Sequence, residues 1–123
     1  MVKEPTPSSS GPRGGIEPLH SDFRADEGMR EIIVLFLFEI PDRMQNLTSL
    51  REQGDRTGFA RLLHQIKGAG GGYGYPLISQ AALRVSRCLE ASGDSWLDTC
   101  DTHFDFLLNV LRRAHAGLSD LQE

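Results

Sequence analysis

The chain has 123 residues, of which 39% are apolar and 24% charged, and its formal net charge is −4. Length and composition are those of one soluble globular domain, and the acidic balance argues against general nucleic-acid binding. The longest apolar run, Ile32 to Phe38, has seven residues. A membrane-spanning helix needs about 20, so no transmembrane anchor is expected.

Other features of the composition favour a cytoplasmic protein. The N-terminus has no apolar signal core, so export by a cleaved signal peptide is not expected. Cys88 and Cys100 are too few for a disulfide framework. Both stand at apolar-periodic positions and are interpreted as free thiols in the core. No Cys and His spacing typical of a metal site occurs, so no metal is expected.

Residues 1–22 differ in composition from the rest of the chain. They contain four of the six prolines, three glycines and three consecutive serines. Such a segment buries too little apolar surface to offset the entropy lost on ordering. We predict that residues 1–22 are a disordered tail or linker and that residues 23–123 form the folded domain.

Apolar side chains recur at spacings of three and four in four later stretches, which is typical of amphipathic helices. The stretches span about 25–51, 55–73, 76–93 and 95–118. Asp55 is a candidate N-cap, and Pro76 suits a first helical turn. Pro41 lies inside the first stretch, where we expect a kink or a break that leaves a short extra N-terminal helix. With no period-two segment, the prediction is an all-α, antiparallel up-down four-helix bundle.

The second stretch contains a glycine-rich segment, His64 to Gly74, that does not match a phosphate-binding loop, because its glycines follow Lys67 instead of preceding it. Each helical residue turns by about 100°. With Phe59 set at zero, the core face includes Leu63 and Ile66, and His64 lies about 140° away. We therefore predict that His64 points out of the bundle.

Small and cationic residues surround His64 on this outer face. Lys67 lies one turn ahead, and Gly68 leaves the next position on that face without a side chain. An exposed imidazole is a nucleophile near neutral pH, and Lys67 can stabilise a phosphoryl group on it. No base, metal cage or nucleotide site accompanies it, so His64 is interpreted as a carrier that needs no cofactor of its own and reacts with a docked partner.

The segment from Arg56 to Leu89 contains five cations and no carboxylate, although the whole chain is acidic. Such a positive patch steers an acidic partner surface. Together with the outer face of the second stretch, it gives the candidate docking residues Thr57, Ala60, Arg61, Gly68, Gly71, Arg84 and Arg87.

The pattern His64-x-x-Lys67-Gly68, followed by small residues and Gly74, resembles the signature of histidine phosphotransfer domains. Leu62-Leu63 and Leu77-Ile78 also fit, and the resemblance covers about residues 23–118. It implies a four-helix phosphocarrier, not an enzyme. His64 would take a phosphoryl group from a receiver-domain aspartate or a histidine kinase and pass it to a response-regulator aspartate.

The resemblance also implies residue roles. Lys67 would assist the phosphate, Gly68 would permit close approach, and the receiver would bring the magnesium. The family often has Leu-Glu where this chain has Val85-Ser86, and Arg84 or Arg87 is a candidate to replace that polar contact.

Two other interpretations of the function are compatible with the sequence. The chain is also compatible with the phosphoacceptor domain of a chemotaxis-type or hybrid histidine kinase, and with a helical module that docks a receiver without carrying phosphate. We expect a monomer in each case. The cognate kinase, receiver and direction of transfer are not encoded in any motif.

Overall fold

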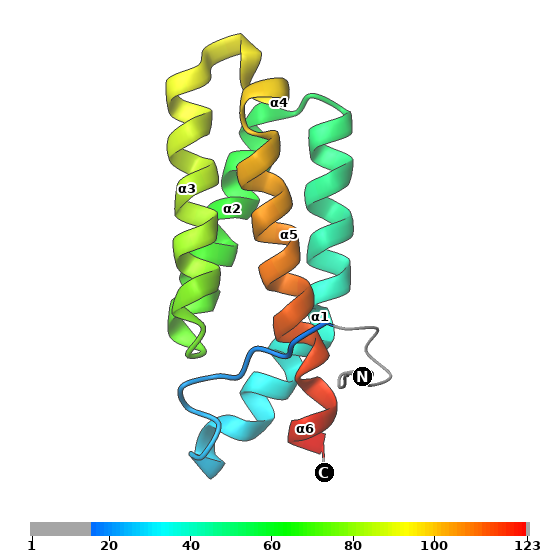
Figure 1. Ribbon diagram of the computed structural model, residues 1–123, viewed down its shortest axis with the longest axis vertical. Helices are drawn as coiled ribbons and strands as arrows, with labels where there is room; N and C mark the ends of the chain where they lie inside the picture. The colour runs from blue at the N-terminus through cyan, green and yellow to red at the C-terminus, as the bar shows by residue number, and fades with distance from the viewer. Residues whose placement is uncertain (1–15, 123) are drawn as a thin grey trace, which may run out of the picture.

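The computed structural model describes residues 16–122, which form helices and no strand. Four long helices lie side by side and alternate in direction (Figure 1). In chain order the elements are α1 (Glu27–Glu52), α2 (Arg56–Gly72), α3 (Pro76–Ser92), a 3-10 turn (Gly93–Ser95), α4 (Trp96–Thr99), α5 (Asp101–Ala116) and α6 (Leu118–Gln122). The predicted all-α four-helix bundle is confirmed. The larger part of the predicted disordered tail, residues 1–15, lies outside the described residues.

The first three helices begin and end within two residues of the predicted bounds. The Asp55 side chain accepts a hydrogen bond from the Gly58 amide at 2.9 Å and caps α2, and Pro76 is the first residue of α3. Gly54 and Gly74 follow α1 and α2 with φ of 70° and 86°. A residue with a Cβ rarely adopts this left-handed backbone, so glycine ends these helices at low conformational cost.

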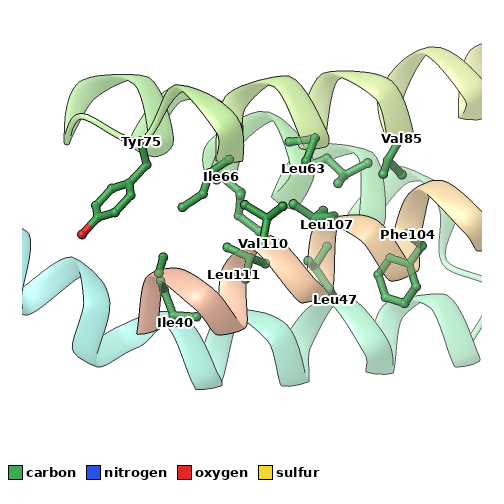
Figure 2. Close-up of a cluster of buried hydrophobic side chains, with 14 of the residues drawn as sticks. Ile40, Leu47, Leu63, Ile66, Tyr75, Val85, Phe104, Leu107, Val110 and Leu111 are labelled. Carbon is green, nitrogen blue, oxygen red and sulfur yellow. The ribbon is translucent and has the colours of Figure 1, made fainter. Parts of the chain in front are cut away.

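The core is a single apolar cluster to which all four long helices contribute (Figure 2). Burying one such leucine, isoleucine or phenylalanine side chain stabilises the fold by about 1.5–3 kcal/mol. The labelled members are Ile40 and Leu47 of α1, Leu63 and Ile66 of α2, Tyr75 just before α3, Val85 of α3, and Phe104, Leu107, Val110 and Leu111 of α5. No helix among residues 16–122 is long and apolar enough to cross a membrane.

The first helix passes through Pro41 without interruption. Ile40 is fully buried while Pro41 is exposed, so the proline ring lies on the outside of the bundle. The cyan N-terminal part of α1 runs at an angle to the remainder (Figure 1). The structure thus has one bent helix, and the alternative of a short extra N-terminal helix is not observed.

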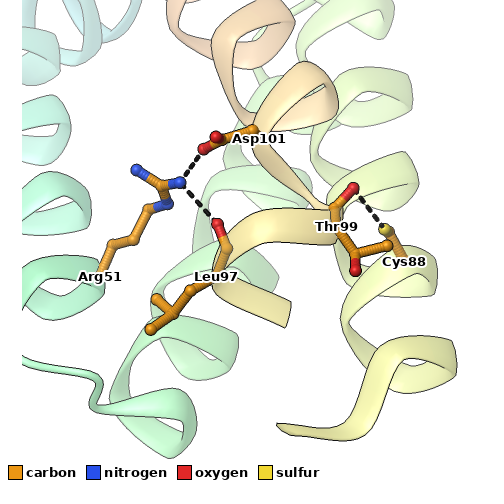
Figure 3. A network of polar contacts seen from close by, with 5 residues as sticks. All are labelled: Arg51, Cys88, Leu97, Thr99 and Asp101. Carbon is orange, nitrogen blue, oxygen red and sulfur yellow. Dashed lines mark hydrogen bonds and ion pairs between the residues drawn. The ribbon is translucent and has the colours of Figure 1, made fainter. Parts of the chain in front are cut away.

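The fourth predicted helix, 95–118, is divided in the structure. A short α4 stops at Thr99, and α5 begins at Asp101. The break frees the carbonyl of Leu97, and Arg51 of α1 donates to it at 2.8 Å while pairing with Asp101 (Figure 3). The apolar spacing continues across the break, so periodicity alone does not reveal it.

The boundary predicted at residue 23 needs a correction, because the domain begins earlier. Within residues 16–22, the Leu19 amide donates to the Arg113 carbonyl at 2.9 Å. The Ser21 hydroxyl donates to the Tyr73 carbonyl at 2.6 Å, and Ser21 is 4% exposed. This segment therefore packs across the end of the bundle instead of belonging to a disordered tail.

Candidate functional site

The second long helix, α2, presents two opposite faces. Phe59, Leu63 and Ile66 are at most 1% exposed and pack into the core. His64 is exposed on the opposite side. This confirms the orientation predicted from the turn of about 100° per residue.

Gly70 explains how closely α3 approaches this helix. A Cβ at Gly70 would lie 2.9 Å from the Cβ and Cγ2 atoms of Ile78 and 3.0 Å from the Ser79 amide nitrogen. The Ser79 hydroxyl also donates to the Lys67 carbonyl, which ties the two helices together. Glycine at position 70 thus allows α3 to lie directly beside the face that carries His64.

Gly68 differs from Gly70 in having no close neighbour in α3. A Cβ added at Gly68 would meet no atom within 4 Å. Gly68 therefore serves no packing contact within the described chain, although glycine costs a helix about 1 kcal/mol relative to alanine. Its position one turn after His64 leaves the surface beside the imidazole open.

A groove of about 290 Å³ lies between α2 and α3 and contains His64 in its wall. We call it the His64 groove. Within residues 16–122, neither the His64 ring nor the Lys67 ammonium takes part in a hydrogen bond or ion pair. The imidazole thus has ring nitrogens available to a reactant. The lining residues are Ala60, His64, Lys67, Leu83, Ser86, Arg87, Leu89 and Glu90.

The α3 wall of the groove brings in residues that the sequence did not single out as partners of His64. Ser86 contributes a hydroxyl and Glu90 a carboxylate. Leu83, Ser86, Arg87 and Glu90 follow helical spacings of three and four, so they share one face of α3. That spacing could have identified Glu90, which directly follows the carboxylate-free segment.

Two of the five cations of the predicted positive patch line the groove, Lys67 and Arg87. The remaining three point elsewhere. Arg84 stacks over the Phe106 ring of α5, with the guanidinium carbon 5.6 Å from the ring centroid. Arg87 is therefore the α3 arginine that lies beside His64.

The other two arginines also lie apart from the groove. Arg56 donates to the carbonyls of Leu89 and Gly93, the latter at 3.0 Å, and so caps the end of α3. Arg61 lines a separate hollow of about 440 Å³ between α1 and α2.

The smaller docking candidates lie where predicted, on α2. Thr57, Gly68 and Gly71 are exposed on the same side as His64, and Ala60 is half-buried in the groove wall. Residues 16–122 contain no group of three or more His, Cys, Asp or Glu side chains able to hold a metal ion. The groove presents the His64 imidazole between two cations, Lys67 and Arg87.

The structure thus presents an exposed histidine without an internal hydrogen-bond partner, next to a lysine, on the surface of a helical bundle. A family model described as "Hpt domain" matches residues 31–122, and the chain belongs to that family. The matched region contains α2, α3 and the whole His64 groove. No curated protein and no solved structure matches the chain. The family places the chain in phosphotransfer within two-component signalling.

Proposed function

We propose that the chain is a phosphorelay intermediate. His64 accepts a phosphoryl group from the aspartyl phosphate of a receiver domain, or from a histidine kinase, and passes it to a response-regulator aspartate. The observation that carries this proposal is the exposed His64 ring without an internal partner, in a groove with Lys67, on the bundle of an Hpt domain.

The transfer step follows from the chemistry of imidazole. A lone pair on a ring nitrogen of neutral His64 attacks phosphorus, the bond from phosphorus to the donor carboxylate breaks, and the carboxylate leaves with its electron pair. The nitrogen–phosphorus bond stores the group until the reverse attack by an acceptor aspartate. Water does not take part in these transfers, so the phosphoryl group passes from donor to acceptor without being hydrolysed.

Two cations serve this step from opposite walls of the groove. Lys67 lies one turn from His64 on α2, and Arg87 extends from α3. A transferring phosphoryl group carries negative charge on its peripheral oxygens, which such cations stabilise. Glu90 in the same groove limits the net positive charge. The magnesium ion that aspartyl phosphate chemistry needs is expected on the receiver, which completes the site when it docks.

The docking surface is the exposed side of α2 around His64. Gly68, Gly71 and Ala60 leave this surface without long side chains, so a receiver can bring its aspartate close to the imidazole. Arg61 lies at the edge of this surface and would attract an acidic partner over about one Debye length, roughly 8 Å at physiological salt.

The test is phosphotransfer from a panel of phosphorylated receiver domains to the purified chain. We expect an acid-labile, base-stable phosphate on the protein, lost in His64→Gln. His103→Gln is the matched control, because His103 is also exposed but lies on α5. Labelling of His64→Gln at the wild-type level would refute the proposal. Binding of a receiver without any labelling would instead identify a docking module.

A histidine kinase tested as the donor extends the same experiment. Labelling by a kinase together with ATP, but by no phosphorylated receiver, would identify the chain as a phosphoacceptor domain of a kinase. Transfer in both directions between receivers would identify a relay intermediate.

A further inference from the structure

The two cysteines of the chain converge on one serine. Cys88 Sγ of α3 lies 3.6 Å from Ser92 Oγ, and Cys100 Sγ lies 3.8 Å from the same oxygen. Cys88 Sγ also lies 3.7 Å from the carbonyl oxygen of Thr99, the residue before Cys100 (Figure 3). The end of α3 and the junction between α4 and α5 thus bring the chain's only two thiols together.

The two thiols differ in access and in acidity. Cys88 is half-buried, whereas Cys100 is 2% exposed. Burial, together with the neighbouring Cys88 thiol, raises the pKa of Cys100 to about 11 against the opposing effects of the Ser92 hydroxyl and Arg56. An oxidant from solution therefore reaches Cys88 first, and Cys100 is the thiol positioned behind it.

We propose that Cys88 and Cys100 are an oxidisable dithiol that a peroxide converts into an intramolecular disulfide. The Cys88 thiolate attacks one peroxide oxygen, the oxygen–oxygen bond breaks, and a sulfenic acid forms as the other oxygen leaves as hydroxide. The Cys100 sulfur then attacks the Cys88 sulfur, and the sulfenic oxygen leaves as water. Two thiols are oxidised, one peroxide is reduced, and two waters are produced.

Local structure permits this bond to form. A disulfide requires the sulfurs to approach to about 2.05 Å, so both side chains must turn past the Ser92 hydroxyl. The intervening segment is a 3-10 turn followed by the four-residue α4, and such short pieces adjust more readily than a long helix. Neither cysteine lines the His64 groove, although Cys88 lies in the chain between Arg87 and Leu89, which do. The inference does not rest on the proposed function.

The experiment treats the reduced full chain with hydrogen peroxide, blocks remaining thiols with an alkylating agent and digests with trypsin. Cleavage after Arg87 and Arg112 leaves both cysteines in one peptide, because no Lys or Arg lies between them. We expect this peptide to be unalkylated and lighter by the mass of two hydrogen atoms. A Cys88 sulfinic acid with Cys100 still alkylated would overturn the proposal.

A second measurement separates proximity in the fold from ordinary thiol reactivity. The protein is equilibrated with reduced and oxidised glutathione, folded and in denaturant. Juxtaposed thiols should favour the internal disulfide about tenfold or more in the folded protein. An equal or smaller equilibrium constant in the folded state would refute the juxtaposition. The oxidised protein should unfold about 10 °C higher, because the bond closes a loop of the unfolded chain, and Cys100→Ser should abolish that shift.

Discussion

Alanine at Gly70 and alanine at Gly68 should change stability in opposite directions, although the two glycines lie two residues apart in α2. The Gly70 Cβ would meet the stem of Ile78 and the backbone nitrogen of Ser79 at 2.9–3.0 Å. Neither neighbour is the flexible end of a side chain, so α2 and α3 must separate. Overpacking of this kind costs about 2–3 kcal/mol.

Helix propensity acts against that cost at Gly70 and acts alone at Gly68. Replacing an interior helical glycine by alanine stabilises a helix by about 1 kcal/mol. Gly70→Ala should therefore lower the free energy of unfolding by about 1–2 kcal/mol net. Gly68→Ala, whose Cβ meets nothing within 4 Å, should raise it by about 1 kcal/mol.

Urea denaturation followed by circular dichroism measures both variants. Midpoints should shift in opposite directions with unchanged slopes, because the surface exposed on unfolding is the same. If Gly70→Ala is as stable as Gly68→Ala, the close crossing of α2 and α3 does not constrain position 70, and the argument for how the groove is built is wrong.

Three further predictions concern transfer, alkaline stability and the break before α5. Lys67→Ala should slow transfer at saturating receiver roughly tenfold to a hundredfold, because it removes a charge-assisted contact of about 1.5–3 kcal/mol. In rapid-quench measurements at several salt concentrations, Arg61→Ala should change only how the transfer rate depends on receiver concentration and on salt. Burial raises the pKa of Tyr75 to about 12 and that of Cys100 to about 11. Both groups are neutral in the folded protein and ionise more readily when unfolded. The stability that they contribute is therefore complete below about pH 9 and falls as pH rises towards 12. Thermal melts should show a shallower fall with pH for Tyr75→Phe. Arg51→Ala should lower the free energy of unfolding by about 0.5–1.5 kcal/mol in urea titrations, the net value of one hydrogen bond, because the Leu97 carbonyl loses its donor.

The orientation of His64 could be predicted from the sequence because it depends only on local geometry. The apolar residues at 59, 63 and 66 fix which face of the helix is buried, and the remaining positions follow from the turn per residue. N-caps and terminal glycines are equally local signals, and α2 begins and ends as they indicate.

The surroundings of His64 depend on contacts between helices, which periodicity does not encode. Arg84 and Arg87 are three residues apart in the same stretch, yet one stacks on Phe106 and the other lines the groove. Which of them faces α2 depends on the rotation of α3, and Gly70 and Ile78 set how closely the two helices approach. A count of charges along the chain therefore overestimates the positive surface beside the histidine.

The start of the domain could not be predicted from the sequence for a similar reason. Composition marks residues 16–22 as tail-like, but their stability comes from distant partners. A Cβ at Gly117 would lie 2.8 Å from the Leu19 carbonyl oxygen, and one at Gly74 would overlap the Ser21 hydroxyl oxygen. Both glycines leave room for the segment 16–22, which crosses them. Their role in packing therefore depends on the position of that segment.

Gly68 and Gly70 of α2 show how the molecule separates stability from function. Position 70 faces inward, where the absence of a side chain lets α3 approach and form the second wall of the groove. Position 68 faces outward, where the same absence improves no internal contact and instead leaves the imidazole accessible. A substitution that stabilises the helix at position 68 is therefore expected to impair transfer, and Gly68→Gln should show both effects at once: a higher unfolding midpoint and slower phosphotransfer to His64. Normal transfer in that variant would mean that the receiver does not approach along this side of α2.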